Sequence, residues 1–186
     1  MTNPEEERIF YIDFDRLLHW LHSYPGELKD VLLEHGDLNY LQVERSPRAF
    51  ETHPETQKRT ETIVNEMGSK ILGFQETIDL ISVCFLLHGD MVHKLLQTED
   101  HTDVGFYGAW PLLFHGWTSP TNRSHVKTEG LEWETPDRFT EEIEEEGFQS
   151  WNQKFQSRKE WKKRVRYLHE CLKEMSAVSE FKLNDD

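Results

Sequence analysis

Apolar residues recur along the chain mostly at the three- and four-residue spacing of amphipathic helices. The longest such series consists of Ile63, Met67, Ile71, Phe74, Ile78, Ile81 and Phe85. This spacing places the side chains on one helical face, so it predicts a helix that starts near Thr56 and forms the centre of the core. Gly68 and Gly73 lie within the series and are expected to bend or divide the helix.

Shorter apolar series predict further helices on both sides of the long one. They are expected after Asp13 as far as Pro25-Gly26, over 27–35, from Asp90, from Pro136 to Gly147, and over 148–175. In the last range, the gap between Phe155 and Trp161 breaks the apolar register and indicates either two helices or one that changes neighbours. Residues 176–186 are predicted to be a flexible tail.

Strand signals are few by comparison. Residues 9–12 form one short apolar run that suits a lone strand or the approach to a helix, and 105–117 suit a packed irregular segment or a short helix begun by Pro111. Residues 43–55 and 118–136 are polar or rich in proline and predict loops, the second with a small hairpin around Glu129-Gly130. The predicted fold is therefore all-α, a single-domain helical bundle of residues 1–186 with at most one short N-terminal strand or a small hairpin.

A His-Gly-Asp tripeptide occurs at His35 and again at His88, each time after an apolar stretch. Histidine suits the negative end of a helix, glycine the left-handed position that follows it, and aspartate the cap of the next helix. We therefore predict that both tripeptides are junctions between helices.

The chain carries 35 acidic against 21 basic residues, a formal net charge of -14, which opposes binding to nucleic acid or to anionic lipid. The N-terminus has no pattern of a secretory signal, and the longest apolar run, 81–87, is too short for a membrane span. Cys84 and Cys171 lie in apolar stretches without metal-ligand spacing, which favours buried thiols in a cytoplasmic protein.

Charge is strongly polarised towards the C-terminus. Residues 132–146 contain eight acids against Arg138, and residues 154–173 contain eight bases against Glu160 and Glu170. The two blocks either neutralise each other as antiparallel helices or leave the acids free for a partner. Acids at a helix C-terminus are disfavoured by the macrodipole, so they do not stabilise the helix itself. This favours the second alternative, an external basic partner.

These features favour a non-enzymatic inhibitory binding protein of bacterial type, an immunity protein or antitoxin that covers a basic toxin such as a nuclease. Aromatic side chains such as Trp110 or Trp117 would anchor such a contact. The residues predicted to bind the partner are Asp137, Glu141, Glu142, Glu144, Glu145, Glu146 and Trp133. A DNA-mimic inhibitor, with acids spaced like phosphates, is a further alternative.

An enzymatic alternative rests on Arg164 and His169, an R-x4-H arrangement in the last predicted helix. It resembles the signature of the HEPN ribonucleases, small helical domains that act as dimers. The resemblance implies that Arg164 steadies phosphate charge and His169 acts as acid or base in RNA cleavage without a metal. That family usually has a polar residue after the arginine, where this chain has Val165.

The ten histidines do not complete a known set of metal ligands, and no local motif marks a serine or cysteine nucleophile. We therefore expect neither a metal nor another cofactor. Among the function classes, a binding protein is favoured over an enzyme.

Overall fold

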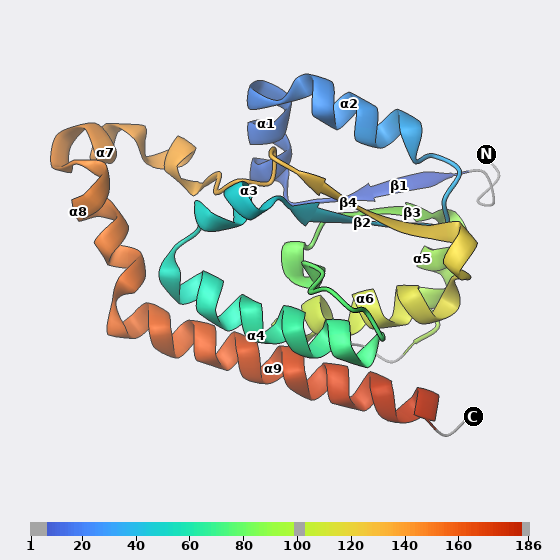
Figure 1. The fold of residues 1–186 in the computed structure, drawn as a ribbon. Coiled ribbons are helices and arrows are strands. Elements are labelled where there is room, and N and C mark those ends of the chain that lie inside the picture. The colour runs from blue at the N-terminus through green and yellow to red at the C-terminus, as the bar shows by residue number, and fades with distance from the viewer. Residues whose placement is uncertain (1–6, 99–102, 184–186) are drawn as a thin grey trace.

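The computed structural model describes residues 7–98 and 103–183 and contains a four-stranded mixed sheet with helices on both faces (Figure 1). The strands are β1 (Arg8–Tyr11), β2 (Tyr40–Arg45), β3 (Phe85–His88) and β4 (Arg123–Thr128). The α-helices are α1 (Phe14–Ser23), α2 (Pro25–Glu34), α3 (Pro47–Glu51), α4 (Glu55–Ile71), α5 (Gly89–Leu95), α6 (Phe106–Trp117), α7 (Thr140–Glu146), α8 (Phe148–Gln153) and α9 (Arg158–Leu183). Short 3-10 turns are η2 (Leu80–Ser82), η3 (Asp103–Gly105), η4 (Pro120–Asn122), η5 (Thr135–Phe139) and η6 (Lys154–Gln156).

The sheet overturns the prediction of an all-α bundle, because the fold is α+β. Its strand order is β1-β3-β2-β4, with β3 antiparallel to both β1 and β2, and β2 parallel to β4. Three of these strands lie where loops or a helix were predicted. β1 matches a stretch for which the sequence permits a strand. β4 ends immediately before the hairpin expected around Glu129-Gly130, but it pairs in parallel with β2 and does not form that hairpin.

The core lies on both faces of the sheet. On one face, Trp20 of α1 and Leu28 of α2 pack against Leu41 and Leu86. On the other face, the aromatic rings of Tyr40, Phe85 and Phe114 lie within 6.2 Å of one another, centroid to centroid. Figure 1 shows α4 and α9 side by side on this second side, where they enclose a third apolar cluster together with α6.

The long helix predicted from Thr56 to Phe85 ends at Ile71. Gly73 has a positive φ of 78°, and its N–H donates to the carbonyl of Lys70 at 3.1 Å, which closes the end of α4. Ile81 then lies in η2 and Phe85 in β3. The apolar series is thus continuous in sequence, but its members belong to different elements.

The prediction that this series lines the centre of the core is also wrong for α4. Ile63, Met67 and Ile71 are 43, 46 and 44% exposed. The buried face of α4 is instead mostly polar and consists of Thr56, Gln57, Thr60, Glu61, Val64, Asn65, Gly68 and Ser69. Burial on this helix follows the polar contacts described below rather than hydrophobicity.

The predicted last helix is divided near the break in its apolar register. Gly147, with a φ of 83°, separates α7 from α8, and η6 separates α8 from α9. The predicted tail is helical as far as Leu183, and Val178 is buried against the third apolar cluster. Residues 184–186 lie outside the described residues.

The His-Gly-Asp tripeptides are not two junctions between helices. His88 ends β3, and its side chain accepts a hydrogen bond from the backbone N–H of Asp90 at the start of α5. Gly73 and Gly147 have positive φ among the described glycines, whereas Gly36 and Gly89 do not. For residues 105–117 the sequence allowed a packed irregular segment or a short helix begun by Pro111. The structure has the helix α6, which begins at Phe106 and contains Pro111 in its interior.

Candidate functional site

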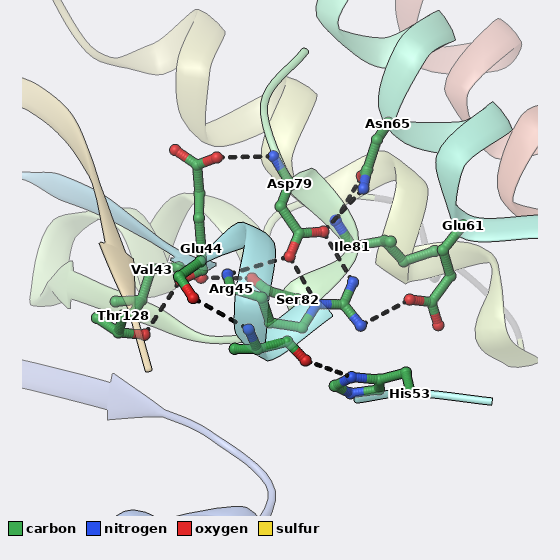
Figure 2. A network of polar contacts seen from close by, with 12 residues as sticks. Val43, Glu44, Arg45, His53, Glu61, Asn65, Asp79, Ile81, Ser82 and Thr128 are labelled. Atoms are coloured by element: carbon green, nitrogen blue, oxygen red, sulfur yellow. Dashed lines mark hydrogen bonds and ion pairs between the residues drawn. The ribbon is translucent and has the colours of Figure 1, made fainter. Parts of the chain in front are cut away.

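A cluster of charged side chains lies inside the molecule, where the end of β2 meets α4 and the segment before β3 (Figure 2). Arg45 donates from Nε and Nη2 to the carboxylate oxygens of Asp79 at 2.6 and 2.8 Å. Its Nη1 lies 2.8 Å from Oε2 of Glu61 on α4. All the guanidinium nitrogens of Arg45 therefore face carboxylates, which compensate for the loss of hydration at this buried site.

Further polar contacts hold the cluster to the sheet and to α4. Asn65 donates to Asp79 Oδ1 at 2.8 Å and accepts from the backbone N–H of Ile81 at 3.1 Å. Glu44 Oε2 accepts from the N–H of Asp79 at 2.9 Å, and its Oε1 is hydrogen-bonded to His125 of β4. The network thus joins β2, β4, α4 and the segment before β3, as Figure 2 shows for most of its members.

The pKa values of two buried groups reflect this environment. Burial raises the pKa of Asp79, but Arg45 and the hydrogen bond from Asn65 outweigh it and hold that pKa below its ordinary value. Burial lowers the pKa of His53 well below 6.5, and the charge of Arg45 lowers it further. His53 is therefore neutral near pH 7, with Nδ1 3.0 Å from the carbonyl of Ala49.

A cavity of about 310 Å³ lies between α4, α9, η5 and the start of α1. Glu61 belongs both to its wall and to the network of Arg45. Other charged groups of the wall include Arg16, Glu134 and Arg164, and its aromatic groups are Tyr107, Trp133, Phe155 and Tyr167. Cavities of this size and mixed lining are typical of sites for small molecules.

The charged groups of the cavity are less completely paired than Arg45. Arg16 Nε and Glu134 Oε2 lie 3.5 Å apart, and within the described chain neither atom has a hydrogen-bond partner. Arg164 donates from Nη2 to Gln57 at 2.7 Å, while its buried Nε lacks an acceptor there. Because unpaired buried polar atoms are costly, these atoms mark the wall as suited to a polar ligand.

The residues of the ribonuclease hypothesis do not meet at one place. Arg164 lines the cavity, with Nη1 3.5 Å from Glu61 Oε1. His169 is exposed on α9. A shared catalytic site for this pair would therefore need a second chain.

The acidic residues predicted to bind a partner lie mainly on α7, which with η5 and α8 forms an arm beside the body of the molecule (Figure 1). Glu141, Glu144 and Glu145 are exposed. Glu142 and Glu146 pair with Lys154 of η6, at 3.3 Å for Glu142. The contacts of α9 are chiefly with α4, α6 and η3, so the basic helix is directed to the core rather than to α7.

Asp137 and Trp133 make contacts between this arm and the rest of the molecule. Asp137 Oδ2 lies 2.6 Å from His19 Nδ1, on α1. Trp133 is only 7% exposed, and its ring lies 5.3 Å from that of Trp151 and 5.0 Å from that of Phe155, centroid to centroid. Trp110 and Trp117, also considered as anchors, pack against the apolar cluster around Phe114.

The sequence interpretation did not single out the buried network or the cavity. Gln42, Glu44 and Arg45 lie in β2, in which every residue is buried, and the partners that they find in Asp79 and Ser82 are 34 to 40 residues away in sequence. The one available signal was the polar character of the face of α4 opposite Ile63 and Met67.

The described residues contain no group of three or more His, Cys, Asp or Glu side chains placed to hold a metal ion. In the same part of the chain, each helix is too short or too polar to cross a membrane.

Comparison of the chain with protein-family models, with curated proteins and with solved structures found no match.

Proposed function

We propose that this chain is an inhibitory binding protein of the immunity-protein or antitoxin type, which captures a basic protein partner in the bacterial cytoplasm through the acidic arm of η5, α7 and α8. The observation that carries the proposal is the exposure of Glu141, Glu144 and Glu145 on α7. An exposed anionic helix attracts a cationic surface over several ångströms and speeds its association.

An apolar contact next to the acids supports the same surface. Phe148, which follows Gly147 at the start of α8, is 47% exposed. Aromatic side chains surrounded by charged residues are frequent anchors of protein interfaces. On the partner, the matching surface would be a basic patch with an apolar depression.

The arm is also held in place before any partner arrives. Trp151 is buried among Trp133, Phe139 and Phe155, with ring centroids 4.9 to 5.6 Å from its own. A surface that is ordered in advance loses less conformational entropy on binding. The free thiols Cys84 and Cys171, both buried, fit the proposed reducing compartment.

The test is capture of the partner from the native cell with the purified chain as bait, followed by identification of what is bound. We expect a basic protein that the wild type inhibits in its own activity assay. A variant with Glu141, Glu144 and Glu145 changed to lysine should lose both capture and inhibition, with an association rate lower by about tenfold or more.

The matched control changes three exposed acids elsewhere, Asp30, Glu34 and Glu66, to lysine, so that the net charge changes by the same amount. This control should bind like the wild type at physiological salt. If both variants lose partner binding equally, net charge alone explains the effect. If the arm variant binds the partner as well as the wild type does, the proposal is contradicted. If neither the wild type nor the control variant inhibits the captured protein, an immunity or antitoxin role is excluded.

A further inference from the structure

The cavity between α4, α9 and η5 combines groups of both charges at its wall. The cations are Arg16, Arg138, Lys163 and Arg164. The anions are Asp13, Glu61, Glu134 and Glu160. Since the two sets balance, the cavity favours a ligand without net charge over a phosphate or a polyamine.

Burial separates these groups into a floor and a mouth. At the floor, the side chains of Arg16, Glu134 and Glu61 are 9 to 10% exposed. At the mouth, those of Arg138 and Lys163 are 58 and 44% exposed. A ligand that enters past the mouth would thus meet its strongest polar contacts at depth, where water screens them least.

The unpaired atoms specify what such a ligand must carry. The Nε atoms of Arg16 and Arg164 and the Oε2 atom of Glu134 form no hydrogen bond in the described chain, and Arg16 Nε faces Glu134 Oε2 only as an ion pair at 3.5 Å. A carboxylate would accept from a guanidinium, and an ammonium group would donate to Glu134. A zwitterion carries both a carboxylate and an ammonium group, so one small molecule could make both contacts.

The wall of the cavity also contains aromatic rings from α6, α9, η6 and the segment before η5. Trp133, Phe155, Tyr107 and Tyr167 line the cavity. Their rings offer faces and edges on which another aromatic ring packs favourably. An aromatic side chain on the ligand therefore fits this part of the cavity better than a short or charged one.

The backbone at the cavity is also strained. Val83, which lies in the wall, has φ 56° and ψ 40°, a left-handed conformation that is unfavourable for a β-branched residue. Such residues cluster at binding and active sites, where the surrounding structure holds them.

We propose that this cavity binds a free aromatic α-amino acid, with its carboxylate at Arg16 and Arg164, its ammonium group at Glu134 and its ring among the aromatic side chains of the wall. This site is separate from the exposed acids of α7 proposed to bind a protein partner. A failure of either proposal leaves the other intact.

The test is isothermal titration of the purified full chain with L-phenylalanine, L-tyrosine and L-tryptophan. Two analogues of phenylalanine each lack one charged group: 2-phenylethylamine has no carboxylate and 3-phenylpropanoate has no ammonium. We expect saturable binding of at least one of the amino acids and, for phenylalanine, affinity about tenfold or more above that of either analogue. These comparisons use the unaltered protein, so they do not depend on the folding of a variant.

Substitutions then locate the site. Glu134→Gln and Arg164→Gln should each weaken amino-acid binding by about tenfold or more. The matched controls Glu66→Gln and Arg59→Gln lie on exposed positions of α4 outside the cavity and should bind like the wild type. The proposal is overturned if none of the three amino acids binds at millimolar concentration, if the analogues bind as well as phenylalanine, or if the controls weaken binding as much as the cavity variants.

Discussion

Arg45 and His53 show how single residues at the centre of this fold depend on their surroundings. Arg45 stays charged inside the molecule because Asp79 and Glu61 contact its guanidinium group. His53 lies near that charge, and its pKa is lowered first by burial and then by Arg45. A buried base beside a buried cation is stable only in its neutral form.

His53 is therefore expected to make stability depend on pH below its unfolded pKa of about 6.5. Below that pH His53 binds a proton in the unfolded chain but not in the folded chain. The free energy of unfolding therefore falls as the pH falls towards the folded pKa. The slope from this residue is at most about 1.4 kcal/mol per pH unit. Urea unfolding of the wild type and of His53→Asn between pH 5 and 7.5 measures it.

Asparagine retains a nitrogen donor for the carbonyl of Ala49, the partner of His53 Nδ1, but it does not titrate. We expect the free energy of unfolding of the variant to depend less steeply on pH between pH 5 and 6.5 than that of the wild type. The same slope in both proteins would assign the pH dependence to other histidines.

At the scale of elements, helix packing rather than helix propensity decides which substitutions are tolerated. Gly108 of α6 faces α9 so closely that an added Cβ would lie 2.6 Å from the carbonyl oxygen of Cys171. That neighbour is backbone and cannot turn aside. The contact explains why α6 and α9 approach each other at this position.

Gly108→Ala should therefore destabilise the protein by about 1–3 kcal/mol, since it forces two packed helices apart. Alanine has the higher helix propensity by about 1 kcal/mol, so propensity alone predicts the opposite sign. Gly26→Ala in α2 is the control, because an added Cβ there meets nothing within 4 Å. Thermal or urea unfolding compares the two, and a stabilising Gly108→Ala would contradict the packing argument.

At the scale of the whole molecule, the arm joins the body through few polar contacts. His19 on α1 lies with Nδ1 2.6 Å from Asp137 and with Nε2 3.1 Å from Glu132. His19 therefore links the position of the arm to α1 and the sheet beneath it.

Replacing His19 with alanine should loosen the arm while leaving the sheet unchanged. Partly exposed pairs of this kind contribute up to about 1 kcal/mol, so hydrogen exchange in α7 should become faster by roughly fivefold. His22→Ala is the matched control, because His22 is exposed on the same helix. If exchange in α7 is unchanged in His19→Ala, the ring contacts of Trp151 hold the arm without this link.

The sequence by itself determined the local features of the protein. The spacing of apolar residues located most of the helices, the gap between Phe155 and Trp161 indicated the division before α9, and the charge pattern identified the acidic block of α7. These features depend on residues close together in the chain, so a window of sequence contains the forces that produce them.

Only the tertiary structure decided the sheet, the buried face of α4 and the cavity. Polar residues such as Gln42, Glu44 and Arg45 are stable inside β2 because Asp79, Ser82 and Glu61 satisfy them from distant parts of the chain. With those partners in place, α4 buries its polar face and exposes Ile63 and Met67. Hydrogen bonds and ion pairs between remote residues thus outweighed the hydrophobic pattern on which the sequence prediction of an all-α bundle depended.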